Sequence, residues 1–247
     1  YYNEIRFYTE GMEALLHVTD DLTIAKRLKE QGEAVLVYLH EDNRGQDFSG
    51  YLFAVEDPED LEQEYVERVW RRLKGLPWNI LATDRLMVRE TIPEDVDAFY
   101  TIYSDPMITR YMEGLYPEVE QEKQYIREYI EKVYTYYGFG VWTVIEKESG
   151  AVIGRAGISY REGFELPELG FLIGVPWQGR GYAEEVCRAV LCYSFRALQF
   201  EQVQALVEPG NEASLKLCEK LGFGQEAVVT LNQKKYCQMV LWKKPVG

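Results

Sequence analysis

Cysteine, histidine and long apolar runs are all scarce in this chain of 247 residues. The four cysteines lie beyond residue 186, and none of them forms a Cys-x-x-Cys pair. The two histidines, His17 and His40, lie far from them in the sequence. This distribution suits neither a disulfide framework nor a zinc site, so we expect a reducing compartment and no metal.

No apolar run approaches the roughly 20 residues that a membrane-spanning helix needs. No signal peptide is visible, although the chain begins with Tyr1 and not with Met. We therefore expect a cytoplasmic protein without a membrane partner. Basic residues are also in the minority, 27 against 41 acidic ones, which gives a formal net charge of −14. A broad acidic surface repels nucleic acid and anionic lipid, whereas cationic amines are compatible with it.

What the chain does contain is two successive α/β patterns. In residues 1–80, strand-like apolar runs alternate with helical stretches, at 14–18, 22–31, 34–39, 51–55 and 61–73. This order predicts a small α/β domain with a short parallel sheet, in which Asp20 and Asp21 cap the first helix. The pattern is weakly similar to half of a haloacid-dehalogenase-like Rossmann domain, but the Asp-x-Asp nucleophile of that superfamily is absent. Three roles stay open for this domain: recognition of a substrate, homodimer formation, or stabilisation of the second domain.

The segment 75–82 marks the joint, so we place the second domain at residues 81–247. Its strand-like runs lie at 85–90, 139–146, 151–160, 166–175, 203–207, 225–231 and 235–242. Helical patterns lie between them, at 94–103, 119–137, 181–198 and 211–221. The long helix is expected to turn one stripe inward, formed by Ile126, Tyr129, Ile130, Val133 and Tyr137.

The most informative stretch runs from Glu168 to Ala183, where a strand leads through a proline into the turn Gln178-Gly-Arg-Gly-Tyr-Ala183 and then into a helix. The first N–H groups of a helix have no intrahelical partners, and the helix dipole favours negative charge there. Gly179 and Gly181 allow a pyrophosphate to approach the backbone, and Arg180 adds a cation. The turn therefore predicts a site for a phosphate-bearing cofactor.

A second motif is Asn211-Glu-Ala-Ser-Leu-Lys-Leu-Cys-Glu-Lys-Leu-Gly-Phe223. On a helix, Asn211, Ser214 and Cys218 share one face, and Gly222 is placed to end the helix in the left-handed conformation. A helical face of short polar side chains suits a position beside a ligand. An ordinary N-cap asparagine followed by a solvated serine explains the same residues, and the motif alone does not decide between the two.

Together these motifs resemble the GCN5-related N-acetyltransferase (GNAT) family. The turn at 178–183 matches that family's Arg/Gln-x-x-Gly-x-Gly/Ala pyrophosphate loop, and the helix at 211–223 matches its Asn-x-x-Ser and Lys-Leu-Gly-Phe element. The strands at 83–90 and 168–173 look like those of the branch that acetylates ribosomal-protein N-termini. The resemblance covers residues 83–243 and implies a mixed, mostly antiparallel sheet split around acetyl-CoA.

The resemblance also implies which residues bind acetyl-CoA. Backbone N–H groups of the central strand would polarise the acetyl oxygen and bind the pantetheine, and the turn would hold the pyrophosphate. The residues assigned to the cosubstrate in this way are Phe171, Leu172, Ile173, Gln178, Gly179, Arg180, Gly181, Tyr182, Ala183, Asn211 and Ser214.

Catalytic groups follow from the same resemblance. Glu168 matches the strand carboxylate that is the family's frequent general base, with Glu165 as the alternative, and an exposed structural glutamate explains the residue equally well. Many members place a tyrosine where this chain has Cys218, so the acid that protonates the leaving thiolate is either Ser214 or Cys218. Cys218 is also a typical small core residue.

Aromatic residues are dense around the expected acceptor cleft, which we place at Tyr116, Tyr137 and Phe139. Acidic residues such as Glu113 and Glu122 lie nearby in the sequence, and together these groups would receive a cationic amine by charge and by cation–π contact. A solvated helix face with core tyrosines would produce the same pattern.

These motifs predict an acetyl-CoA-dependent N-acetyltransferase in which a primary amine attacks the thioester directly, without an acyl-enzyme. The acceptor is either a protein N-terminus or a small amine such as a polyamine or an aminoglycoside. The alternative is a non-catalytic acyl-CoA-binding sensor, which the absence of a tyrosine at position 218 would favour.

Overall fold

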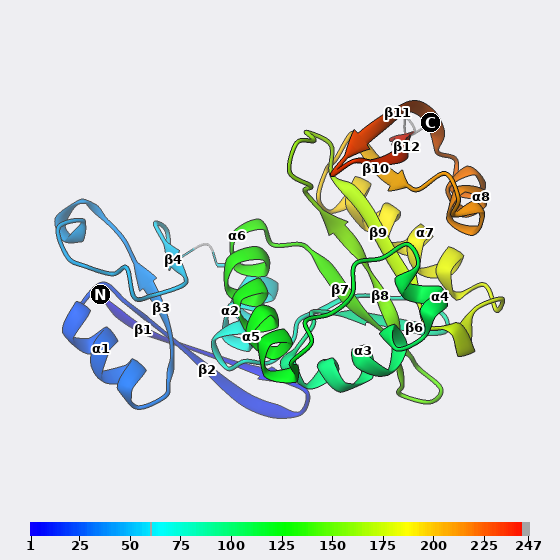
Figure 1. Ribbon diagram of the computed structural model, residues 1–247. Helices are drawn as coiled ribbons and strands as arrows, with labels where there is room; N and C mark the ends of the chain where they lie inside the picture. Colours follow the sequence, from blue (N-terminus) through cyan, green and yellow to red (C-terminus); the bar gives the residue numbers. More distant parts are fainter. Residues whose placement is uncertain (60, 244–247) are drawn as a thin grey trace. The chain divides into compact units, whose positions relative to one another are not determined.

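The computed structural model describes residues 1–59 and 61–243 (Figure 1). The chain divides into two compact units, one formed by Tyr1–Trp78 and the other beginning at Asn79. The second unit begins before the expected residue 81, because the end of the apparent linker forms a strand of its sheet. In the part of the chain that the structure describes, no helix has the length and apolar character of a bilayer span.

The first unit is a four-stranded sheet with two helices. Its elements are β1 (Tyr2–Thr9), β2 (Met12–Thr19), α1 (Leu22–Glu30), β3 (Ala34–Tyr38), β4 (Ala54–Val55) and α2 (Gln63–Leu73). The strands lie in the order β1-β2-β3-β4, in which β2, β3 and β4 are parallel and β1 is antiparallel to β2. The sequence pattern misses β1 because most of its residues are exposed and it contains no continuous apolar run.

Capping in this unit follows the sequence only in part. Asp21 caps α1, because its carboxylate accepts the N–H groups of Thr23 and Ile24 at 2.7 and 3.0 Å. Asp20 does not cap the helix; its carboxylate lies 3.0 Å from Nε2 of His40. The strand expected at 51–55 is reduced to the two residues of β4.

The second unit is built on an eight-stranded sheet in the order β11-β12-β10-β9-β8-β7-β6-β5. Its strands are β5 (Asn79–Ala82), β6 (Leu86–Arg89), β7 (Val141–Glu146), β8 (Val152–Ser159), β9 (Glu168–Ile173), β10 (Gln202–Val207), β11 (Gly224–Leu231) and β12 (Lys234–Trp242). Neighbouring strands are antiparallel except β9 and β10, which are parallel. The expected α/β fold with a mixed, mostly antiparallel sheet is confirmed.

Helices cover both faces of this sheet. They are α3 (Val96–Tyr103), α4 (Pro106–Thr109), α5 (Val119–Tyr129), α6 (Thr135–Tyr137), α7 (Tyr182–Arg196) and α8 (Glu212–Leu221). Ile173 of β9 belongs to one apolar cluster with Val186 of α7, whereas its neighbour Leu172 belongs to another with Ile102 of α3. Since successive strand residues point to opposite faces, α7 and α3 lie on opposite faces of the sheet.

A π-helical turn at Ile130–Tyr134 interrupts the long helix expected at 119–137. The extra residue in this turn advances the inner stripe by one position. Tyr134 is therefore fully buried, with its hydroxyl donating to the Val141 carbonyl at 2.6 Å, and Tyr137 is 47% exposed. A strict 3.6-residue period predicts the opposite, so the inward placement of Tyr137 is wrong for this reason.

The parallel strands β9 and β10 separate soon after they begin. Within the described residues a single register pair, Glu168 with Gln204, joins them. Beside it, the Gln204 N–H donates to the Pro167 carbonyl at 2.8 Å, and the Gln204 side-chain amide donates to the Leu166 carbonyl at 2.9 Å. Further along, the alternation of the β8–β9 ladder turns the backbone groups of Phe171 away from β8. The sheet is therefore open at Phe171, with backbone N–H and C=O groups at the edge of the opening.

Candidate active site

The turn at 178–183 has the backbone that its glycines predict. Gly179 and Gly181 have positive φ angles of 74° and 82°, a region that residues with a Cβ seldom adopt. Gly181 is the N-cap of α7, which is 15 residues long. The N–H groups at the start of α7 lack intrahelical acceptors and point out of the helix end, where the dipole favours an anion.

Side chains around this turn hold it in place. Gln178 Nε2 donates to the carbonyl of the last residue of β9 at 2.8 Å, and the Tyr182 hydroxyl donates to Glu146. The guanidinium carbon of Arg85 lies 4.4 Å from the centroid of the Tyr182 ring, and Arg85 donates to the Arg180 carbonyl at 3.0 Å. Gln178 and Tyr182 thus use their polar side-chain atoms within the protein. The backbone of the turn is the part that is left to bind a phosphate.

A cavity of about 530 Å³ lies at this turn, and we call it the glycine-turn cavity. Its wall contains all but one of the residues predicted to bind the cosubstrate: Phe171, Leu172, Ile173, Gln178, Gly179, Gly181, Tyr182, Ala183, Asn211 and Ser214. The exception is Arg180, which is exposed and lies outside the wall. Lys216 and Lys220, which the sequence motifs do not single out, add cations to this cavity.

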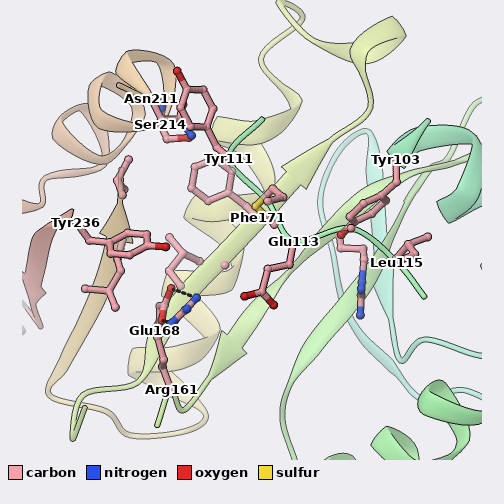
Figure 2. A pocket seen from close by; sticks show the side chains of 18 of the residues that line it. Tyr103, Tyr111, Glu113, Leu115, Arg161, Glu168, Phe171, Asn211, Ser214 and Tyr236 are labelled. Carbon is pink, nitrogen blue, oxygen red and sulfur yellow. Dashed lines mark hydrogen bonds and ion pairs between the residues drawn. The ribbon is translucent and has the colours of Figure 1, made fainter. Parts of the chain in front are cut away.

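A second cavity, of about 640 Å³, lies beside Glu168, and we call it the Glu168 cavity (Figure 2). Residues common to the walls of both cavities are Tyr111, Met112, Phe171, Asn211 and Ser214. The two cavities therefore meet where β9 parts from β10 and α8 begins. A molecule in one cavity and a molecule in the other reach each other beside Phe171.

Glu168 is a buried titratable group in the wall of this cavity, with a side chain that is 8% exposed. Arg161 donates to both of its carboxylate oxygens, from Nε at 2.5 Å and from Nη2 at 3.1 Å (Figure 2). Burial raises the pKa of Glu168 above its usual value, and the hydrogen bonds and charge of Arg161 act against this rise. A carboxylate with a raised pKa suits the role of general base. Glu165, the alternative base, is exposed and lines neither cavity.

Asn211 and Ser214 lie at the start of α8, at the junction of the cavities. The side-chain oxygen of Asn211 accepts the Ser214 N–H at 3.3 Å, so Asn211 is the N-cap of the helix. The Tyr111 hydroxyl donates to the Gly210 carbonyl at 2.6 Å and ties the loop after α4 to this helix start. The N-cap role and the place beside a ligand, which the sequence leaves as alternatives, are therefore compatible.

Cys218 belongs to the hydrophobic core and to neither cavity wall. Its side chain is fully buried, and burial raises the pKa of its thiol to about 11. The helix face that presents Ser214 at the cavities enters the core one turn later, at Cys218. We therefore withdraw Cys218 as the acid, and Ser214 is the one of the two candidates that lines the junction.

Of the three predicted cleft residues, only Tyr116 lines the Glu168 cavity. Tyr137 and Phe139 line neither cavity and instead contact each other and Tyr160, with ring centroids 5.8 Å apart in each pair. The π-helical turn, which rotates Tyr137 away from the inner stripe, is the physical reason for its displacement. The acceptor cleft is corrected accordingly.

Two charged residues of the Glu168 cavity, Arg155 and Arg161, are missing from the sequence prediction of the site. The sequence motifs single out neither of them, whereas Glu113, which the sequence places near the acceptor cleft, does line this cavity. A charged residue inside an otherwise buried strand is the signal that identifies Arg155. Nothing in the local sequence pairs Arg161 with Glu168, because the two meet through the turn between β8 and β9. Within residues 1–59 and 61–243, no group of three or more His, Cys, Asp or Glu side chains is arranged to hold a metal ion.

This chain is similar to several known proteins. The acetyltransferase (GNAT) domain family matches residues 85–224. The protein YkkB of Bacillus subtilis (strain 168) is 30% identical over 175 residues, which cover 68% of this chain and 92% of YkkB. The ribosomal protein uS5-alanine N-acetyltransferase of Escherichia coli (strain K12) is 30% identical over 155 residues, which cover 59% of this chain and 78% of that enzyme.

Solved structures show the same fold. The spermidine N-acetyltransferase of Vibrio cholerae, in complex with CoA and spermine, aligns with a TM-score of 0.55 at 18% identity and covers 65% of this chain and 96% of that one. The domain match spans more than half of the chain and includes the glycine turn and α8. The chain therefore belongs to the GNAT family and is an N-acetyltransferase.

Proposed function

We propose that acetyl-CoA binds in the glycine-turn cavity and that a primary amine enters the Glu168 cavity, so that the acetyl group passes between them beside Phe171. The observation that carries this proposal is the common wall of the two cavities at the opening between β9 and β10. Two reactants held at such a junction react as if at very high local concentration, and this positioning alone contributes much of the acceleration.

The residues of the chain fit the parts of acetyl-CoA. The N–H groups at the start of α7 suit the diphosphate. Lys216 and Lys220 lie nearby, and each is paired with a glutamate, Glu212 and Glu184 respectively. The backbone edge of β9 at Phe171 suits the acetyl oxygen and the pantetheine amides, because its donors are preorganised. We assign Arg180 a weaker role, as an exposed cation at the rim of the turn.

Glu168 is the proposed general base. The acceptor ammonium gives one proton to the Glu168 carboxylate, directly or through a water molecule, and the amine nitrogen then bonds to the acetyl carbon. As the C–S bond breaks, the Ser214 hydroxyl gives its proton to the departing sulfur. The nitrogen loses its second proton, which returns to Ser214 directly or through a water molecule, so the products are an amide and a thiol. Asn211 binds the pantetheine or a water molecule beside it.

Both kinds of acceptor, a protein N-terminus and a small amine, are compatible with this chemistry. The names of two relatives point to one kind each, a ribosomal protein in one case and spermidine in the other. The Glu168 cavity has a volume of about 640 Å³, which lies within the range of small-molecule sites. We therefore favour a small amine.

Release of coenzyme A in the presence of acetyl-CoA and a panel of amines tests the proposal. The panel includes small amines and peptides with free N-termini, and we expect thiol release that depends on the amine. An acyl-CoA sensor would bind acetyl-CoA, and so raise the apparent melting temperature, without releasing thiol. Binding without amine-dependent release would overturn the proposed reaction.

From charge and composition alone, we propose further that the enzyme works in the cytoplasm and requires neither nucleic acid nor a membrane. The unit at residues 1–80 recognises the acceptor, supports a homodimer or stabilises the catalytic unit. Light scattering during gel filtration measures the oligomeric state directly.

A further inference from the structure

Arg155 is a partly buried cation in the wall of the Glu168 cavity, and no carboxylate of residues 1–59 and 61–243 forms an ion pair with it. Its Nε atom is buried and makes no hydrogen bond. Burial lowers the pKa of Arg155, but the hydroxyls of Tyr103 and Tyr134 raise it, and the net pKa lies above the usual value. The guanidinium is therefore charged at any physiological pH.

Contacts within the chain satisfy this cation only in part. The guanidinium carbon of Arg155 lies 4.9 Å from the centroid of the Phe99 ring, and such a contact stabilises the face of the cation. The five N–H donors lie at its edge and need acceptors of their own. The Tyr103 hydroxyl accepts a hydrogen bond from one of them. The other donors have no carboxylate partner among the described residues, and burying a cation without an anion is costly, so an acceptor from outside the chain would complete the site.

Arg155 and Glu168 lie on the same face of the sheet, at opposite ends of the β8–β9 pair. In the β8–β9 ladder, Arg155 pairs with Leu172, Gly157 with Gly170, and the last residue of β8 with Glu168. Residues directly opposite each other in an antiparallel pair point to the same face. The two charged residues are thus separated along the strands by about 13 Å of backbone, and only glycines lie between them on this face.

Between the two charged residues this face is open at Gly170 but not at Gly157, where an added Cβ would lie 2.1 Å from the Gly140 carbonyl oxygen. A Cβ atom added at Gly170 would have no neighbour within 4 Å, and Gly170 lines the Glu168 cavity. A small molecule lying over Gly170 would have Arg155 on one side and Glu168 on the other. The same position is next to Phe171, where the two cavities meet.

The charges of this cavity are arranged for a molecule that carries both signs. Arg161 is paired with Glu168, and Glu122 accepts the Tyr116 N–H at 3.0 Å. Glu113 makes no hydrogen bond or ion pair within the described residues, although its charge raises the pKa of Arg161. Figure 2 shows the Glu113 carboxylate pointing into the cavity. Among the described residues of this wall, the cation Arg155 and the carboxylate Glu113 have no ion-pair partner, and both are therefore available to a ligand.

We infer that the acceptor is a small amine that also carries a carboxylate, as an amino acid does. Arg155 binds the carboxylate of the acceptor, and the amine lies over Gly170 toward Glu168 and Phe171. The inference rests on the proposed acetyl transfer and narrows its acceptor. A polyamine would place a second cation beside Arg155, which is unfavourable. A protein N-terminus has a peptide bond at the position where Arg155 would bind a carboxylate.

Matched pairs of acceptors test the inference on the unaltered enzyme. Each pair consists of an amine with a carboxylate and its counterpart without one: phenylalanine with 2-phenylethylamine, and 4-aminobutanoate with butylamine. The panel adds the other common amino acids, spermidine and peptides with free N-termini. We expect kcat/KM for the best carboxylate-bearing amine to exceed that of its counterpart by at least about 100-fold, because the counterpart leaves a buried donor unpaired.

The outcomes separate this inference from the proposed function. If no amine of the panel causes coenzyme A release, acetyl transfer itself fails. If spermidine, a peptide or an amine without a carboxylate is acetylated as well as the amino acids or better, acetyl transfer stands and the inference about the acceptor is overturned.

An Arg155→Met variant tests whether the preference for carboxylate-bearing amines depends on Arg155. We expect KM for the carboxylate-bearing amine to rise by about 100-fold or more, with little change for its counterpart. Arg127→Met is the matched control, since Arg127 is exposed, lines neither cavity and carries the same charge. Equal losses for both members of a pair would assign Arg155 a structural role and contradict the inference. If Arg155→Met does not fold, the comparison of pairs on the unaltered enzyme still decides.

Discussion

Arg161 and Glu168 form a two-point ion pair in which the carboxylate is buried and the guanidinium is not. The Glu168 side chain is 8% exposed and the Arg161 side chain is 41% exposed, while the two contact distances are 2.5 and 3.1 Å. An exposed arginine is free to exchange its partner for water at little cost, whereas the carboxylate stays in the wall of the cavity. This asymmetry suits a base that is held in place until an amine arrives.

Replacing the carboxylate with an amide tests the assignment of the base. We expect Glu168→Gln to lower kcat by about 100-fold or more, because proton transfer by a positioned base contributes about that much. The dissociation constant of acetyl-CoA, measured by calorimetry, should stay nearly unchanged, since Glu168 does not line the glycine-turn cavity. An unchanged kcat would remove Glu168 from the mechanism.

The pH dependence of the reaction follows from the same pair. Burial raises the pKa of Glu168 above 4.5, and Arg161 holds the rise back. A base works only when deprotonated, so kcat/KM should fall as the pH drops through this pKa. Arg161→Met removes the opposing cation, and the acidic limb of the profile should therefore move to higher pH. Arg127→Met, the exposed control, should leave the limb in place, and a limb that moves to lower pH in Arg161→Met would contradict the account.

The phosphate site proposed at the glycine turn predicts that Gly181→Ala and Gly224→Ala differ in their effects on stability and on acetyl-CoA binding. Gly181→Ala forces a Cβ into a φ of 82°, which costs about 1–2 kcal/mol of stability, and it disturbs the N–H groups that we assign to the diphosphate. Gly224→Ala is the control, because Gly224 has no positive φ and an added Cβ there would have no neighbour within 4 Å. Thermal unfolding with and without acetyl-CoA should show a lower melting temperature and a smaller ligand-induced rise in Gly181→Ala only. Equal behaviour of the two variants would argue against a phosphate site at this turn.

Substitutions in α8 distinguish the two candidates for the acid, the Cys218 thiol and the Ser214 hydroxyl. Cys218 is a core residue, so Cys218→Ala should lower the free energy of unfolding by about 1 kcal/mol and leave kcat nearly intact. Ser214 lines the junction of the cavities, so Ser214→Ala should lower kcat with little effect on stability. Steady-state rates and denaturant unfolding of both variants provide the comparison. A large loss of kcat in Cys218→Ala alone would reverse the assignment.

Local chemistry predicted much of the fold and the cosubstrate side of the site. The glycines of the turn at 178–183 require positive φ angles, and Gly222 ends α8 in the left-handed conformation as expected. Such features depend on a few adjacent residues, so a sequence motif specifies them. The same holds for the apolar runs that form β7 to β10.

The acceptor side was predicted only in part, through Glu168 and Tyr116, because the rest of it depends on contacts between segments far apart in the chain. The π-helical turn adds one residue to a helix whose apolar periodicity looked regular, and this single residue removed Tyr137 from the inner stripe. Glu168 and Arg161 meet through a turn, and Arg155 reaches the same cavity from β8. No periodicity or motif indicated that Arg155, Arg161 and Glu168 share a cavity.

A crystal structure of the complex with acetyl-CoA tests the central claim most directly. The account predicts that the diphosphate lies on the N–H groups at the start of α7, next to Gly181, and that the thioester lies beside Phe171 where the two cavities meet. Density for the diphosphate away from this turn, or for the thioester on the far side of α8 from Glu168, would contradict it.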